Sequence, residues 1–304
     1  MKTSLLLLIC FFNLAIVAAA GTDTLKLQQH LVAITGTAQA RNHQNPEALN
    51  QVAHYIAKEF GQLKGQVREQ VYTVADTEYR NVILSTGPAD APRLVIGAHY
   101  DVCQDQPGAD DNASGVAGLL ELARLLNNHT LPYRIDFVAY TLEEPPYFRT
   151  EHMGSYIHAK SLKEEQAVVK GMISLEMIGY FKDEKKTQRY PVAPMKLFYG
   201  SRGNYIAIVQ RFGNGSFGRS FLRNYKNEAV LPVKSLRAPA FVTGVDFSDH
   251  LNYWHFGFDA LMITDTSFYR NANYHQPTDT IHTLDLQRMA QVVDGVYATV
   301  LNLK

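Results

Sequence analysis

The chain has 304 residues with 46% hydrophobic and 19% charged side chains, and its 29 basic and 29 acidic residues cancel. This length can bury one sizeable core and suits a single large α/β domain. A neutral chain without a cluster of basic and aromatic residues argues against a nucleic-acid-binding surface, so no nucleic-acid partner is expected.

Residues 1–20 have the features of a signal peptide. Lys2 supplies the positive charge, residues 4–17 the apolar run and residues 18–20 the small side chains before cleavage. A retained anchor is the alternative, but the run is shorter than the roughly 20 apolar residues of a comfortable membrane span. We expect an exported protein, periplasmic or extracellular, with no membrane contact after cleavage.

Residues 21–304 are predicted to form one domain of the α/β class, a mainly parallel mixed sheet sandwiched by helices. Short apolar runs predict the strands, and apolar residues at helical spacing predict the helices. Strands are expected at residues 67–74, 79–84, 93–98, 134–140, 169–175 and 260–264, and helices at 25–34, 46–63, 113–127 and 286–303. Residues 179–245 are interpreted as an insertion that shapes a substrate pocket, with some strand content at 195–199.

A polar motif follows the strand at 93–98 directly. His99 comes first, and Asp101 lies two residues later, where a carboxylate can accept the second ring N–H of a histidine. Taken alone, a histidine at a strand end is more often structural.

Two adjacent aspartates, Asp110 and Asp111, precede the helix at 113–127 and lie among small residues. One interpretation is that Asp111 or Asn112 caps the helix, where its positive end favours a carboxylate. The other is that a carboxylate here bridges two metal ions.

Glu143 and Glu144 end the strand at 134–140 and precede Pro145 and Pro146, which stiffen the turn. One carboxylate can bind a metal while its neighbour takes a proton from water. A solvated surface pair is the alternative.

Glu176 interrupts an apolar run at the end of the strand 169–175, and His275 follows the strand 260–264. A buried carboxylate needs a partner, so Glu176 is either a ligand or a member of an ion pair. Ligands bind at the carboxyl edge of open α/β sheets, and two histidines with three carboxylates there suit zinc. Five ligands are too many for one tetrahedral ion, whereas one shared carboxylate with two ligands on each side fits two ions.

These motifs, in this order, resemble those of the two-zinc aminopeptidases, metallo-exopeptidases whose relatives include glutamate carboxypeptidase and glutaminyl cyclase. The resemblance covers nearly all of residues 21–304. It is carried by His99-x-Asp101, Gly108 to Gly115, Glu143-Glu144, Glu176 to Gly179, Ser248-Asp249-His250, and His275 before Thr278-Asp279-Thr280.

The resemblance implies a zinc-exopeptidase fold of the phosphorylase/hydrolase-like type and two zinc ions per chain. The implied metal ligands are His99, Asp111, Glu144, Glu176 and His275. Asp111 would be shared, with His99 and Glu176 on one ion and the other two ligands on the second. Glu143 would be the general base, and Asp101 would orient His99.

Two features depart from the family's pattern. Position 176 is often aspartate in the family, and the glutamate here has a longer reach. The glutamate pair is usually followed soon by a glycine-rich turn, whereas residues 145–153 intervene here before Gly154. This longer loop is expected to line the substrate cleft, so the family's specificity does not transfer to this chain.

The predicted function is a zinc metallo-aminopeptidase that hydrolyses N-terminal residues from peptides. A glutaminyl cyclase with one zinc is the nearest rival, and metal stoichiometry separates the two. A carboxypeptidase would need a cation for a C-terminal carboxylate, which Arg149, Arg202 or Arg270 could supply. A non-catalytic receptor domain is disfavoured because all the implied ligands are present. The oligomeric state does not follow from the sequence.

Cys103 is the one cysteine outside residues 1–20, so no internal disulfide is expected. It lies four residues past His99 and could approach the site. A loop cysteine without a role is the favoured interpretation, because a reactive thiol needs an electropositive setting.

Overall fold

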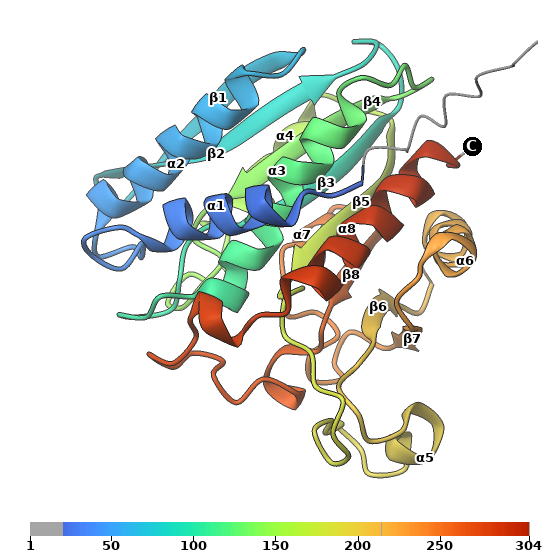
Figure 1. Cartoon of the computed structure of the whole chain (residues 1–304). Coiled ribbons are helices and arrows are strands. Elements are labelled where there is room, and N and C mark those ends of the chain that lie inside the picture. Colours follow the sequence, from blue (N-terminus) through green and yellow to red (C-terminus); the bar gives the residue numbers. More distant parts are fainter. Residues whose placement is uncertain (1–20, 214, 304) are drawn as a thin grey trace, which may run out of the picture.

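The computed structural model describes residues 21–213 and 215–303 (Figure 1). Its strands form one sheet in the order β1-β2-β4-β3-β5-β8-β6-β7. The strands are β1 (Gln66–Val74), β2 (Thr77–Thr86), β3 (Arg93–His99), β4 (Arg134–Tyr140), β5 (Val169–Glu176), β6 (Ile206–Arg211), β7 (Val233–Ala238) and β8 (Ala260–Thr264). The central strands β4, β3, β5 and β8 are parallel to one another, whereas β2 and β6 pair with them antiparallel.

Helices cover both faces of the sheet (Figure 1). They are α1 (Thr24–Thr35), α2 (Pro46–Gly61), α3 (Gly115–Leu126), α4 (Gly154–Glu164), α5 (Met195–Tyr199), α6 (Phe217–Glu228), α7 (His250–His255) and α8 (Leu286–Leu301). Side chains of β3 alternate between two cores: Leu94 and Ile96 lie in the core that includes α3, and Val95 lies in the core that includes α4. The predicted α/β fold, with a mixed and mostly parallel sheet between helices, is confirmed.

Helix α2 illustrates how local sequence produces these elements. Pro46 lies at its start, where the missing N–H leaves no hydrogen bond unmade. Leu49, Val52, Ile56 and Phe60 then recur at helical spacing and are all buried. Each such side chain contributes about 1.5–3 kcal/mol through burial, so packing holds the helix on the sheet.

The prediction of strand content at residues 195–199 is wrong, because Met195–Tyr199 forms the short helix α5. Pro194 precedes it with a φ of −62°, which suits the start of a helix. Gly200 ends it with a φ of +79°, a region that favours glycine. Residues 179–245 also contain β6, α6 and β7, which the sequence reasoning did not predict.

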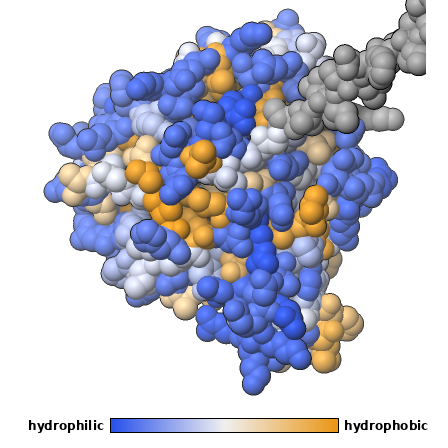
Figure 2. Space-filling model, viewed as in Figure 1, coloured by the Kyte–Doolittle hydropathy of each residue, from blue (hydrophilic) through white to orange (hydrophobic). Residues whose placement is uncertain are grey.

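The face seen in Figure 2 is largely hydrophilic, with hydrophobic side chains gathered in separate patches. Exposed apolar side chains include Leu197 and Phe198 of α5. Within residues 21–213 and 215–303, no helix has the length and apolar character needed to cross a membrane. The predicted signal peptide, residues 1–20, lies outside the described residues.

Candidate metal centre

The predicted site residues meet at one edge of the sheet. His99 is the last residue of β3, and Glu176 is the last residue of β5. Glu143 and Glu144 lie in the loop after β4, and His275 lies in a loop after β8. Because these strands are parallel, their carboxyl ends point the same way and present the five side chains to a common crevice.

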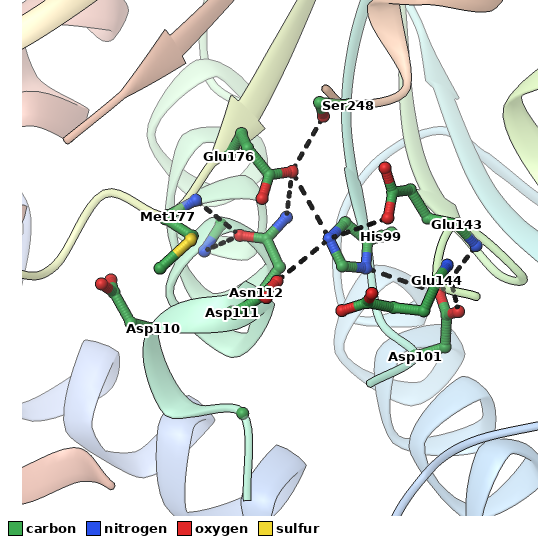
Figure 3. A network of polar contacts seen from close by, with 12 residues as sticks. His99, Asp101, Asp110, Asp111, Asn112, Glu143, Glu144, Glu176, Met177 and Ser248 are labelled. Atoms are coloured by element: carbon green, nitrogen blue, oxygen red, sulfur yellow. Dashed lines mark hydrogen bonds and ion pairs between the residues drawn. The ribbon is translucent and has the colours of Figure 1, made fainter. Parts of the chain in front are cut away.

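The ring of His99 has carboxylates around one nitrogen (Figure 3). Its Nε2 lies 3.4 Å from Glu176 Oε2, 3.5 Å from Asp111 Oδ1 and 3.9 Å from Glu143 Oε2. Ser248 donates a hydrogen bond of 2.8 Å to Glu176 Oε2 and so fixes this longer side chain. The ring nitrogen and the carboxylates of Asp111 and Glu176 form a group of donors close enough to share one ion.

His275 faces the other oxygen of the same aspartate. Its Nε2 lies 3.1 Å from Asp111 Oδ2 and 3.3 Å from Glu144 Oε2. Asp111 therefore offers one carboxylate oxygen to each histidine, and the nearest glutamate is Glu176 for His99 and Glu144 for His275. A carboxylate shared between two metal ions requires this arrangement.

Several donor atoms at the site are buried without a hydrogen-bond partner among the described residues. They are His99 Nε2, His275 Nε2, Asp111 Oδ2 and Glu144 Oε1. A buried polar atom without a partner costs about 1–3 kcal/mol. Imidazole and carboxylate donors are those that zinc binds. The donor set thus fits divalent metal ions.

The electrostatics of the site also favour a cation. Burial raises the pKa of Glu143 well above its usual range, and Glu144 and Glu176 raise it further against the effect of His99. Burial, with Asp111 adding to it, raises the pKa of Glu144 to about 7. Burial would raise the pKa of Asp111 as well, but the two histidines outweigh it and hold that pKa low. A divalent cation stabilises the ionised form of all these carboxylates.

Asp101 connects two of the loops. Its carboxylate accepts the backbone N–H groups of Glu143 at 3.2 Å and Glu144 at 3.0 Å. Its Oδ1 also lies 3.5 Å from His99 Nδ1, the ring nitrogen that faces away from Asp111. Asp101 thus lies where it can hold the glutamate pair and the histidine ring in one geometry.

The adjacent aspartates have different surroundings. Asp110 accepts hydrogen bonds from Gly179 N at 3.0 Å and Asn271 Nδ2 at 2.8 Å, and it points away from the histidines (Figure 3). Asp279 accepts the backbone N–H groups of both Asp110 and Asp111 at 3.0 Å. Asp279 therefore positions Asp111, a role that was not predicted although Asp279 belongs to one of the sequence motifs.

Of the two residues considered as the helix cap, Asp111 does not act as one. Helix α3 begins at Gly115, and Asp111 and Asn112 have non-helical backbone angles. Asn112 accepts the N–H groups of Gly115 at 3.2 Å and of Met177 at 2.9 Å. Asn112 thus ties the start of the helix to the end of β5, and Asp111 is free to face the histidines.

A buried arginine that the sequence analysis did not identify supports the same loop. Arg41 is 1% exposed and donates to the carbonyls of Tyr100 at 2.8 Å and Gly108 at 2.6 Å, and also to that of Pro107. These carbonyls lie near the two ends of the segment that leads from β3 to Asp111. Burial lowers the pKa of Arg41 to about 10, so the side chain stays charged at neutral pH beside the acidic centre.

A cavity of about 350 Å³ opens onto the metal donors. Its aromatic lining includes Phe148, Tyr190, Tyr199, Tyr205, Phe247 and Phe268. Phe148 comes from the long loop 145–153, and three of the tyrosines come from residues 179–245. Both segments thus contribute to the cavity wall.

The three arginines considered as a carboxylate clamp do not line this cavity in the described part of the chain. Arg149 forms an ion pair with Asp246, and Arg270 donates to Gln188. Arg202 is exposed and donates to a backbone carbonyl. Arg189 and Lys234 do line the cavity, and Lys234 Nζ lies 4.3 Å from the centre of the Tyr205 ring.

The model of peptidase family M28 matches residues 81–300. The chain belongs to peptidase family M28. This M28 chain is 45% identical over 287 residues to uncharacterized protein YfbL of Escherichia coli strain K12. The matched region covers 92% of this chain and 88% of YfbL. It is 26% identical over 255 residues to aminopeptidase YwaD of Bacillus subtilis strain 168. This match covers 81% of this chain but only 50% of YwaD.

The solved structure of an aminopeptidase from Aneurinibacillus sp. strain AM-1 matches with a TM-score of 0.70 and 15% identity, over 92% of this chain and 94% of that one. At this identity the match shows the zinc-exopeptidase-like fold alone. The M28 chain is therefore a member of a metallopeptidase family with buried histidine, aspartate and glutamate groups that can hold metal. Family membership implies peptide substrates and, typically, zinc.

Proposed function

We propose that this M28 chain is an aminopeptidase that removes residues from the N-termini of peptides with a pair of zinc ions. The observation that carries the proposal is the position of Asp111, whose two oxygens lie 3.5 Å and 3.1 Å from the nitrogens of two different histidines. One ion would be held by Asp111 with His99 and Glu176, and the other by Asp111 with the remaining glutamate and histidine. Bound zinc supplies a Lewis acid that polarises a carbonyl and makes water easier to deprotonate.

Glu143 is the proposed general base. Its carboxylate lines the cavity, and the nearest basic nitrogen, His99 Nε2, is 3.9 Å away. Its backbone N–H donates to Asp101 Oδ1, and this hydrogen bond helps to keep the Glu143 side chain at the cavity. Glu143 takes the proton of the attacking water and returns it to the leaving amine. The raised pKa of this carboxyl suits a group that must hold a proton between these two steps.

The charge of the site supports a substrate with a free N-terminal amine. Five buried carboxylates surround the centre, from Asp101, Asp111, Glu143, Glu144 and Glu176. Of these, only Glu143 lines the cavity without being a proposed metal ligand, so its carboxylate is the group that can face a free N-terminal ammonium.

The aromatic walls of the cavity support a preference for large apolar side chains at the N-terminus. Apolar and aromatic side chains typically line pockets that bind apolar groups. Lys234 adds a positive charge to the same cavity, which disfavours a cationic side chain. We therefore propose leucyl and phenylalanyl substrates over lysyl ones.

A panel of aminoacyl chromogenic substrates tests this proposal, with zinc content measured on the same sample. We expect hydrolysis of leucyl and phenylalanyl substrates, near two zinc ions per chain, and no hydrolysis when the amine is acetylated. Cyclisation of N-terminal glutamine with near one ion per chain would instead identify a glutaminyl cyclase. Release of C-terminal residues from N-blocked peptides would identify a carboxypeptidase, and either result would overturn the proposal.

We also propose that the protein is exported, on the basis of the charged, apolar and small-residue regions of residues 1–20. Cell fractionation followed by N-terminal sequencing checks this. We expect the exported form to begin at Gly21. Retention of the full chain in the cytoplasm would contradict it.

A further inference from the structure

The loop between β3 and Asp111 carries a cysteine beside the second half of the metal centre. Cys103 is a free thiol and is 6% exposed. Its sulfur, a ring nitrogen of His275 and a carboxylate oxygen of Glu144 all lie within 4.8 Å of one another. The thiol therefore joins a nitrogen and an oxygen donor in one group, in which the cysteine and the glutamate are buried and His275 is partly exposed.

The backbone on both sides of Cys103 is held in place. Val102 donates its N–H to the Arg41 carbonyl at 3.1 Å, and Asn42 donates to the Gln104 carbonyl at 2.7 Å. The residues on either side are therefore tied to one segment at 41–42. The cysteine is fixed beside the donors rather than placed there by a mobile loop.

Two donor atoms next to the thiol have no hydrogen-bond partner in the described part of the chain and can bind a metal ion. Glu144 is 5% exposed, and its Oε1 has no hydrogen-bond partner among the described residues. His275 Nε2 also has no hydrogen-bond partner among the described residues, and it lies 3.1 Å from Oδ2 of the shared Asp111. Sulfur, nitrogen and oxygen donors together form a set that zinc binds readily, since thiolate is among its preferred ligands.

We propose that Cys103 is a fourth protein ligand of the metal ion held by Asp111, Glu144 and His275. The inference rests on the metal-binding part of the proposed function and is independent of the peptide specificity. It makes the two halves of the centre unequal. The half with the thiolate has four protein ligands and is closed, as in structural zinc sites, whereas the half with His99 has three and keeps an open position.

Cadmium titration of the metal-free full chain tests the proposal, because a thiolate bound to cadmium gives a charge-transfer absorption that carboxylate and imidazole ligands do not give. We expect this absorption in the unmodified protein and its loss in the C103S variant. C103S should also bind the tighter of the two metal ions at least about tenfold more weakly, since even changes outside the ligand shell cost 10–100-fold.

Two matched variants serve as controls. A chain that keeps residues 1–20 also carries Cys10, so C10S must retain the absorption. Glu176→Gln alters the other half of the centre and must retain it as well. Circular dichroism verifies that C103S is folded, and C103A provides a second test if it is not.

An equally strong absorption in C103S would overturn the proposal. So would the absence of the absorption in the unmodified protein when equilibrium dialysis shows bound cadmium, and in that case the metal-binding proposal would stand without Cys103. No binding of cadmium or zinc at all would refute both this inference and the proposed function.

Discussion

Replacement of Arg41 by methionine should destabilise the fold and weaken metal binding together. The guanidinium is buried and donates to three backbone carbonyls that lie near both ends of the loop before Asp111. Methionine fills a similar space but donates no hydrogen bond. The loop should then lose the contacts that fix the distance between His99 and Asp111.

The size of the effect follows from two opposing contributions. Hydrogen bonds from a charged donor contribute about 1.5–3 kcal/mol each, or roughly 4–9 kcal/mol for three. The burial that lowers the pKa of Arg41 from 12.5 to about 10 offsets about 3 kcal/mol of this, at ~1.4 kcal/mol per pKa unit. The net loss of unfolding free energy in R41M is therefore about 1–6 kcal/mol, with about 3 kcal/mol as the central value.

Urea unfolding in the presence of a chelator measures this loss for metal-free R41M. Equilibrium dialysis measures the zinc affinity of R41M, which should be about 10–100-fold weaker than that of the unmodified protein. Arg223 is exposed on α6 and provides the matched control, with an expected change within about 0.5 kcal/mol for R223M. If R41M unfolds at the same urea concentration as R223M and binds zinc equally well, the proposed role of Arg41 is wrong.

Three further predictions concern stability. Burial lowers the pKa of His158 to about 3, so below pH 6.5 this side chain takes up a proton only in the unfolded chain. The contribution of His158 to stability should therefore fall by about 2 kcal/mol between pH 7 and 5, and H158N, compared with the unmodified protein in urea unfolding at both pH values, should lack that contribution. A methyl group added at Gly154 would meet Asn81 Oδ1 at 2.0 Å, so G154A should lose about 1–3 kcal/mol, whereas G61A, with open space around it, should gain about 0.4–1 kcal/mol. An unchanged thermal midpoint in G154A would contradict the packing described. Zinc at one hundred times its Kd should raise the unfolding free energy by about 2.7 kcal/mol, and an excess of chelator should abolish the gain; calorimetry that shows no shift with zinc would contradict metal binding.

The positions of the central strands and the meeting of the metal donors were predictable from the sequence, because both depend on local patterns. Apolar runs predicted β3, β4, β5 and β8, and a polar residue at or near the end of each identified the edge of the sheet. Helix α4 was missed for a physical reason. Helix α4 buries Gly154, Ser155 and His158 as well as apolar residues, so its buried face lacks a clear apolar period.

The supporting residues could not be predicted because their partners are distant in the chain. Asp279 acts on the backbone of Asp111 from 168 positions away, and Arg41 acts on backbone carbonyls, which leave no trace in residue identity. The placement of Cys103 likewise depends on how its loop is tied to residues 41–42. Spacing motifs identify side chains that perform chemistry, and they do not identify those that hold a loop in position.

The most direct test of the central claim is the Glu143→Gln variant, assayed for zinc content and for hydrolysis of leucyl and phenylalanyl substrates on the same sample. Glutamine keeps the shape of the side chain but cannot take a proton from water. Because Glu143 is not among the proposed metal ligands, zinc content should stay near two ions per chain while turnover falls at least about 100-fold, the usual contribution of a general base. Full turnover with unchanged zinc would contradict the account.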